Sequence, residues 1–217
     1  MEPQTEIDIT NYSFDEFVSF VFSHDVAPEH ETQWYWKMPD VVFAPQQICA
    51  YYMRLFREPE FLLEQFSRPQ LEEGFWAIFG GPDWALQHLL WEPKIPFPER
   101  AECVRAMFDL FSRFFAIEPL EGACMMWWDG ICYDWHCGNR VRERGGEDLE
   151  MQDVMFETIA AILFLDSAHC QKAALHGLGH LHHPETEVLV QRYLAAHPSL
   201  AESEKEYALA AARFRVL

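Results

Sequence analysis

The sequence predicts an all-α protein: a helical bundle that continues into a repetitive helical region at its C-terminal end. Apolar residues recur at intervals of three and four along most of the chain, the spacing that places them on one face of a helix. Prolines and glycines separate these segments at positions that suit helix starts and stops. The sequence shows no alternating apolar and polar run longer than a few residues, and no strand–helix–strand alternation. We therefore expect helices almost throughout.

The first expected helix carries its own start signal. Ser13 and Glu16 have the spacing of a capping box, in which the serine bonds forward and the glutamate reaches back. An apolar stripe follows, made of Phe14, Phe17, Val18, Val21 and Phe22. Residues 24–44 are interpreted as a long connection that carries Trp34, Tyr35 and Trp36.

Four shorter helical segments are expected in the next part of the chain. They are a helix from Pro45 through Phe56, a short one after Pro59, one from Ser67 to Gly80–Gly81, and a short one over 84–91. The clearest helix of the chain comes next, with the stripe Val104, Met107, Phe108, Phe111, Phe114 and Phe115. Residues 121–135 are apolar on nearly all sides, which predicts a buried helix with Trp127 and Trp128 in the core.

The chain is expected to form a single domain over 1–217, with two possible lobes, 1–138 and 148–217. The best linker candidate is Gly138–Gly146, a basic stretch with three arginines. Four helices with short joints are then expected at about 149–165, 167–182, 185–196 and 200–212.

The last third of the chain resembles known helical repeats. The segments 168–181, 188–194 and 206–212 look like stacked helix pairs of the HEAT-repeat kind, with the stretch ALHGLGHL the most specific part. Residues 70–81 and 125–129 also resemble a set of bacterial proteins with HEAT-like C-termini. The similarity covers about residues 40–217. It implies a HEAT-like α-solenoid with an extended surface for partners, and it transfers no active site.

Composition indicates a cytoplasmic protein with a large core. Half of the 217 residues are apolar, with 18 Phe and 8 Trp, so no disulfide or metal is needed to hold the fold together. The longest apolar stretches, such as Thr158–Leu165, are too short to span a membrane. The acidic N-terminus is unlike a signal peptide, and the six cysteines lie mostly among apolar neighbours, as reduced core residues do.

Charge is the most unusual bulk property. The formal net charge is −19, and residues 1–36 hold eight carboxylates but no Lys or Arg. Such a field repels nucleic acid and anionic membranes, and it speeds association with basic partners. Solubility alone is the alternative explanation for this acidity.

The histidines of segment 168–183 allow a second interpretation. His169, His176, His180 and His183 fall within roughly 60° on a helical wheel, opposite an apolar face. His176 and His180, four residues apart, could chelate a transition metal. However, Gly177 stands where a metalloprotease motif has glutamate, no nearby carboxylate run completes a ligand set, and Pro184 is expected to end the helix before His183. We therefore expect no metal and no cofactor.

Other candidate chemistry is weaker. Cys124, Cys132, His136 and Cys137 do not have the spacing of a standard zinc site. Gly177 and Gly179 are interpreted as permitting close helix approach. The sequence contains no nucleophile elbow, P-loop or dinucleotide-binding glycine pattern. The prediction is therefore a non-enzymatic protein.

The leading functional hypothesis is an immunity or inhibitor protein that neutralises a basic toxin or effector through an acidic surface. The alternatives are a regulatory or scaffolding repeat protein, and a metal-binding protein that uses the face of His169, His176 and His180. An aromatic pair rimmed with carboxylates would suit a basic partner. The expected partner-binding residues are Asp25, Glu29, Glu31, Trp34, Trp36, Asp40, His176 and His180.

Overall fold

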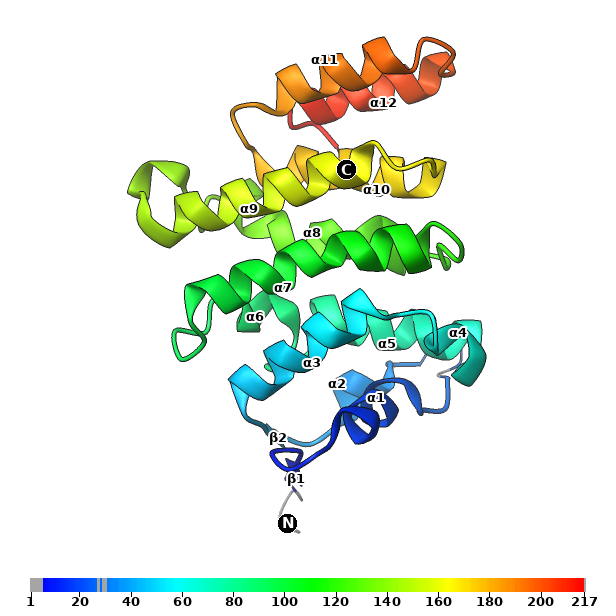
Figure 1. Cartoon of the computed structure of the whole chain (residues 1–217), viewed down its shortest axis with the longest axis vertical. Coiled ribbons are helices and arrows are strands. Elements are labelled where there is room, and N and C mark those ends of the chain that lie inside the picture. Colours follow the sequence, from blue (N-terminus) through cyan, green and yellow to red (C-terminus); the bar gives the residue numbers. More distant parts are fainter. Residues whose placement is uncertain (1–5, 27, 29–30, 217) are drawn as a thin grey trace.

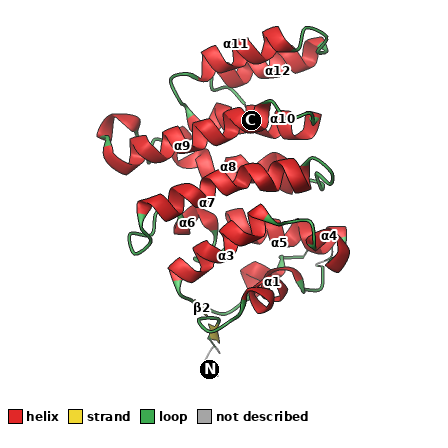
Figure 2. Cartoon of the chain, in the orientation of Figure 1, coloured by secondary structure: helices red, strands yellow, loops and turns green. Residues whose placement is uncertain are grey.

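The computed structural model describes residues 6–26, 28 and 31–216, and this part of the chain is all-α (Figure 2). The N-terminal elements are β1 (Ile7–Asp8), α1 (Phe14–Phe22), α2 (Trp34–Lys37), β2 (Val41–Val42), α3 (Pro45–Arg57), α4 (Leu62–Gln65), α5 (Arg68–Gly80) and α6 (Leu86–Leu89). The C-terminal elements are α7 (Phe97–Leu110), the π-helix η1 (Phe111–Phe115), α8 (Ala123–His136), the 3-10 helix η2 (Arg142–Arg144), α9 (Gly146–Leu163), α10 (Ala168–Leu181), α11 (Thr186–Ala196) and α12 (Glu202–Ala212).

The helices stack in layers along the long axis of the molecule (Figure 1). The pair α3 and α5 is followed by α7 and α8, then α9 and α10, and finally α11 and α12. Contacts between layers follow two rows: α3, α7 and α9 touch in succession, and so do α5, α8, α10 and α12. Each layer therefore packs mainly against the layer before it and the layer after it.

Local signals start the helices where the sequence predicts. The Ser13 amide donates to Glu16 Oε2 at 2.7 Å and the Glu16 amide donates to Ser13 Oγ at 3.3 Å, so the predicted capping box is confirmed. Ser67 and Gln70 form a second box at the start of α5. The four helices expected after residue 149 are α9 to α12, with bounds that differ by a few residues from those expected.

The interpretation of 24–44 as plain connection is wrong in part. α2 and β2 lie within it, and β2 pairs in parallel with β1, Ile7 opposite Val41 and Asp8 opposite Val42. Neither element has a sequence signature, because two-residue strands and a single helical turn are too short for periodicity to show. The expected helix through Phe115 also ends differently, since its last five residues are the π-helix η1.

One continuous hydrophobic core extends from Ile9 to Val216. Aromatic rings fill its centre, and Trp127 packs against Phe56, Phe75 and Phe79 at centroid distances of 5.5 to 6.0 Å. Trp127 and Trp128 are fully buried, as predicted. Such rings each remove a large area from water, so they contribute strongly to stability.

Two glycines of α10 permit the close approach predicted for them. A Cβ added at Gly177 would lie 2.4 Å from Trp128 Cβ, and one at Gly179 would lie 2.2 Å from Val216 Cγ2. Real Cβ atoms are not found at such distances, so only glycine allows α8 and the C-terminal segment to lie this close to α10.

The predicted linker Gly138–Gly146 is tied to the adjoining helices by its arginines. Arg140 pairs with Asp134 and Asp148, at 3.3 and 2.9 Å. Arg142 pairs with Asp153 of α9. The helices α8 and α10, from the two predicted lobes, also pack directly on each other.

Among the described residues, every helix is either too short or too polar to span a bilayer.

Candidate functional site

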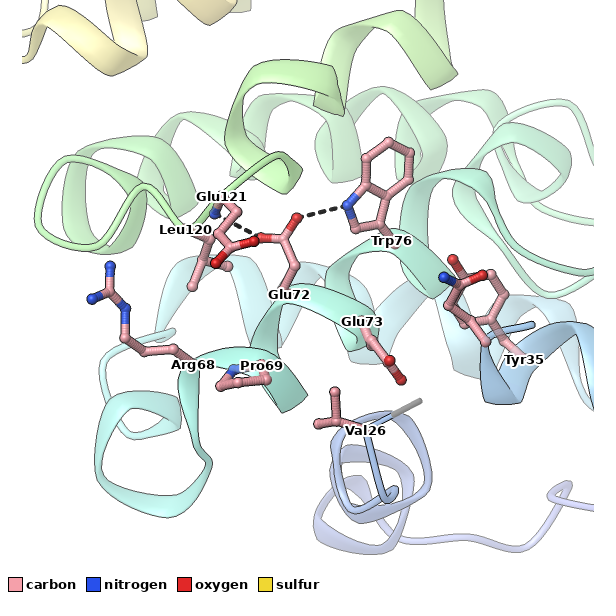
Figure 3. A pocket seen from close by; sticks show the side chains of 10 residues that line it. Val26, Tyr35, Arg68, Pro69, Glu72, Glu73, Trp76, Leu120 and Glu121 are labelled. Atoms are coloured by element: carbon pink, nitrogen blue, oxygen red, sulfur yellow. Dashed lines mark hydrogen bonds between the residues drawn. The ribbon is translucent and has the colours of Figure 1, made fainter. Parts of the chain in front are cut away.

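A cavity of about 690 Å³ lies between α5, the segment around α2, and the turn that precedes α8 (Figure 3). Three stretches of chain that are far apart in sequence therefore form its walls. The lining residues are Val26, Gln33, Tyr35, Arg68, Pro69, Glu72, Glu73, Trp76, Leu120 and Glu121.

Helix α5 supplies the longest wall. Arg68, Glu72 and Trp76 follow one another at intervals of four, so they share one face of the helix. The Ser67–Gln70 capping box and Pro69 in the first turn fix where this helix begins. The start signal of α5 thus sets the direction in which the lining side chains point.

Glu72 joins this wall to α8. Its Oε1 accepts from Trp76 Nε1 at 2.7 Å and from the amides of Gly122 and Ala123 at 2.9 Å each. Its Oε2 accepts from the Glu121 amide at 3.0 Å. A carboxylate at the N-terminus of a helix satisfies amides that have no partner within the helix and interacts favourably with the helix dipole. Glu72 therefore has a structural role, and it holds the turn that carries Glu121 in place.

The cavity is negatively charged. Among the described residues that line it, three are carboxylates and Arg68 is the one cation. Arg68 Nη2 is already paired with Glu118 Oε1 at 2.6 Å. Figure 3 shows Glu73 turned away from Glu72, toward the side where Val26 lies. The cavity therefore favours a cationic occupant.

Tyr35 closes the cavity beside the carboxylates. Burial, reinforced by the charge of Glu73, raises the pKa of Tyr35 to about 12. Tyr35 is thus a neutral phenol under physiological conditions. Val26, which is 43% exposed, and the partly buried Trp76 and Leu120 add apolar surface. Carboxylates next to aromatic and aliphatic surface suit a guanidinium group with its alkyl stem.

The described acidic and aromatic residues predicted to bind a partner do not line this cavity. Asp25 and Asp40 are exposed, Glu31 is paired with Lys37 at 3.3 Å, and Glu29 lies outside the described residues. Trp36 is exposed by 56%. Trp34 instead packs inward, with its ring stacked on His24 at 3.6 Å. The cavity is lined instead by their sequence neighbours Val26, Gln33 and Tyr35.

The prediction that His176 and His180 face a partner needs correction. They are only 2% and 4% exposed, because α8 and α12 cover the imidazole face of α10. His176 Nδ1 lies 2.9 Å from the hydroxyl of Tyr207 on α12, and His180 Nε2 lies 2.9 Å from Asp129 Oδ1 on α8. Burial, with a smaller effect of His180, lowers the pKa of His176 to about 4, so His176 is neutral at physiological pH.

The other two histidines of the predicted stripe lie apart from this pair. His169 is exposed. α10 ends at Leu181 and His182 has left-handed backbone, so His183 leaves the stripe, as Pro184 predicts. His183 pairs with Asp153 at 2.9 Å. The expectation that no nearby carboxylate run completes a ligand set considered only sequence neighbours, whereas Asp129 of the facing helix α8 lies beside His176 and His180.

The cysteines do not join that set. Cys124 and Cys132 are buried, Cys137 is exposed, and burial raises the pKa of the Cys132 thiol. Within the described part of the chain, the grouping with metal-ligand geometry contains Asp129, His176 and His180 and no cysteine.

Comparisons with protein-family models, curated proteins and solved structures give no significant match. The resemblance to HEAT repeats therefore stays a prediction.

The residues that sequence reasoning missed are those whose partners are distant in sequence. Glu72 and Glu121 are 49 positions apart, as the hydrogen bond between them records. The capping-box signal at Ser67 could have shown that Glu72 and Trp76 share a face with Arg68. Nothing local indicates that the turn at 120–121 lies opposite that face.

Proposed function

We propose that the protein binds a basic segment of another protein in the cavity lined by Glu72, Glu73 and Glu121, as an inhibitor or immunity protein does. The observation that carries the proposal is a cavity of about 690 Å³ in which carboxylates stand next to Trp76 and Tyr35. An arginine side chain of the partner would pair with the carboxylate of Glu121 and lay its flat guanidinium against the indole of Trp76.

The charge of the whole chain supports this partner. A formal net charge of −19 accelerates encounter with a basic protein, and the cavity provides a specific place for one of its side chains. Inhibitors of basic enzymes act in this way when they present carboxylates where the enzyme binds an anionic substrate. The six cysteines are free thiols, which supports work in a reducing compartment such as the cytoplasm.

The stacked layers support the proposal that α7 to α12 form HEAT-like pairs. Two rows of helices, each touching the next layer, are the arrangement that such repeats have. In that interpretation the cavity lies toward the N-terminal end of the stack, and the repeats hold its wall rigid.

The test compares two charge reversals of equal size. Glu121→Lys changes a lining residue, and Glu187→Lys changes an exposed residue on α11 in a different layer. Both alter the net charge equally, so any difference between them reports the local site. The tagged proteins are used to capture partners from the native host at low and high salt.

We expect wild type and Glu187→Lys to capture one basic protein that high salt releases, and Glu121→Lys to lose it. The captured protein's activity should fall when wild-type protein is added back. Equal capture by both variants would refute the cavity as the binding site. Capture of several unrelated proteins, without inhibition, would instead support the scaffold alternative.

A further inference from the structure

A second group of polar side chains lies away from the cavity, where α8 packs on α10. Asp129 Oδ1, His176 Nε2 and His180 Nε2 converge there. His180 Nε2 is 2.9 Å from the carboxylate oxygen and 3.3 Å from His176 Nε2, and the third separation is 4.0 Å. The two histidines share a helix face because they are one turn apart, and the aspartate comes from the facing helix.

The triangle is close in size to the ligand set of a zinc-class ion. A point about 2.0 Å from all three atoms exists for these separations, which is the usual length of zinc bonds to imidazole nitrogen and carboxylate oxygen. That point lies in the plane of the three atoms, so a tetrahedral ion requires Asp129 Oδ1 and His176 Nε2 to approach from their present 4.0 Å to about 3.3 Å. Two nitrogens and one oxygen also favour zinc-like metals over calcium or magnesium, which prefer oxygen ligands alone.

Hydrogen bonds among Asp129 Oδ1, His176 Nε2 and His180 Nε2 satisfy these three atoms poorly. When His180 Nε2–H donates to Asp129 Oδ1 at 2.9 Å, His176 Nε2 either shares that hydrogen at 3.3 Å or opposes it with an N–H of its own. Both imidazoles are at least 95% buried, so any further partner for His176 Nε2 has to come from the side of the partly exposed Asp129. One cation would accept a lone pair from each of the three atoms.

The surroundings also resemble those of a metal site. The second ring nitrogen of His176 lies 2.9 Å from the hydroxyl of Tyr207, which orients the ring as outer-shell partners of metal-bound histidines do. The Asp129 side chain is 27% exposed, so the cluster is open on one side. His136 stands on that side, exposed, with its ring centroid 4.9 Å from that of His180.

We propose that Asp129, His176 and His180 bind one divalent transition-metal ion of the zinc class. Its fourth coordination position is left for water or a small ligand that enters from the side of His136. Three protein ligands with one open position distinguish this site from a closed structural zinc site. The site is separate from the acidic cavity, so either proposal can fail without the other.

The test measures zinc affinity by competition with a chromophoric chelator, using full-length protein that carries no histidine tag. Wild type should bind one equivalent of zinc. Asp129→Ala and His180→Gln should each weaken binding by roughly a hundredfold, and Tyr207→Phe by roughly tenfold because only an outer-shell bond is lost. Cobalt added in place of zinc should give the intense visible absorption of a four-coordinate ion.

Controls separate this site from adventitious ligands. His169→Ala removes an exposed histidine of the same helix and Cys137→Ser removes the exposed thiol, and both should bind zinc like wild type. Circular dichroism of the metal-free variants checks folding. Should His180→Gln fail to fold, the partly exposed Asp129 and the hydroxyl of Tyr207 still test the site. Absence of stoichiometric zinc in wild type, or unchanged affinity in Asp129→Ala, would overturn the proposal.

Discussion

Replacing Gly177 with alanine should destabilise the protein, although alanine is the better helix former. The substitution gains about 1 kcal/mol of helix propensity at a mid-helix position. Against this, the new Cβ would lie 2.4 Å from Trp128 Cβ and 2.8 Å from Trp128 Cγ. Carbon atoms pack at about 3.5–4.0 Å, so α8 and α10 would have to separate by more than an ångström.

The magnitude follows from which atoms collide. Trp128 is fully buried and the clashing atoms are next to its backbone, so no rotamer change relieves the contact. Overpacking of this kind costs about 1–3 kcal/mol in the free energy of unfolding, and we expect a cost at the upper end because Trp128 cannot move away. Subtracting the propensity gain leaves a net loss of about 2 kcal/mol in the free energy of unfolding.

The assay is urea unfolding followed by far-ultraviolet circular dichroism, with Gly80→Ala as the matched control. A Cβ at Gly80, the last residue of α5, meets nothing within 4 Å, so this variant should be as stable as wild type or slightly more stable. If Gly177→Ala unfolds at the same urea concentration as Gly80→Ala, the inferred contact between α8 and α10 is wrong.

Three further predictions concern the polar contacts. Glu72→Ala should lower the free energy of unfolding by about 1–2 kcal/mol, because the first amides of α8 lose their acceptor; urea denaturation beside the exposed-site variant Glu64→Ala checks this. Glu147→Gln should remove part of the acid sensitivity. The bond from buried Arg100 lowers the pKa of Glu147 from 4.5, so the contribution is complete above that pH and is lost as the pH falls through the lowered pKa. Since the Glu147 side chain is 52% exposed, wild type and Glu147→Gln should differ by only about 1 kcal/mol in the free energy of unfolding at neutral pH. The melting temperatures of both proteins are measured from neutral to acid pH, and a difference between them that stays the same over this range would contradict the prediction. Zinc should raise the melting temperature of wild type but not of Asp129→Ala, as measured by scanning calorimetry; an equal rise in both would mean that the ion binds elsewhere.

The parts of the fold that were predictable depend on near neighbours in sequence. The Ser13–Glu16 box, the helices after residue 149 and the burial of Trp127 and Trp128 all follow from spacings of three or four residues. The end of α10 before His183 follows from the single residue Pro184. Short-range geometry is enough in each case.

The candidate sites depend on distant parts of the chain, and the sequence carries no local sign of them. Asp129 meets His176 across 47 positions because α8 and α10 occupy adjacent layers. The wheel of α10 correctly gathers His176 and His180, but periodicity cannot say whether that face meets solvent or another helix. Here it meets α8 and α12, which turns an expected surface into a buried cluster.

The layered arrangement also bears on how the chain reaches its folded state. Because each pair of helices touches mainly its neighbours, most contacts join segments close in sequence, a topology associated with rapid folding. Folding can begin in one helix pair and spread to the next, as it does in repeat proteins. The C-terminal end of the stack has an additional contact, because Val216, which follows α12, packs against Gly179 of α10. The residues after α12 thus hold the last helix pair against α10, and a chain truncated just after α12 would lose this contact while keeping every helix.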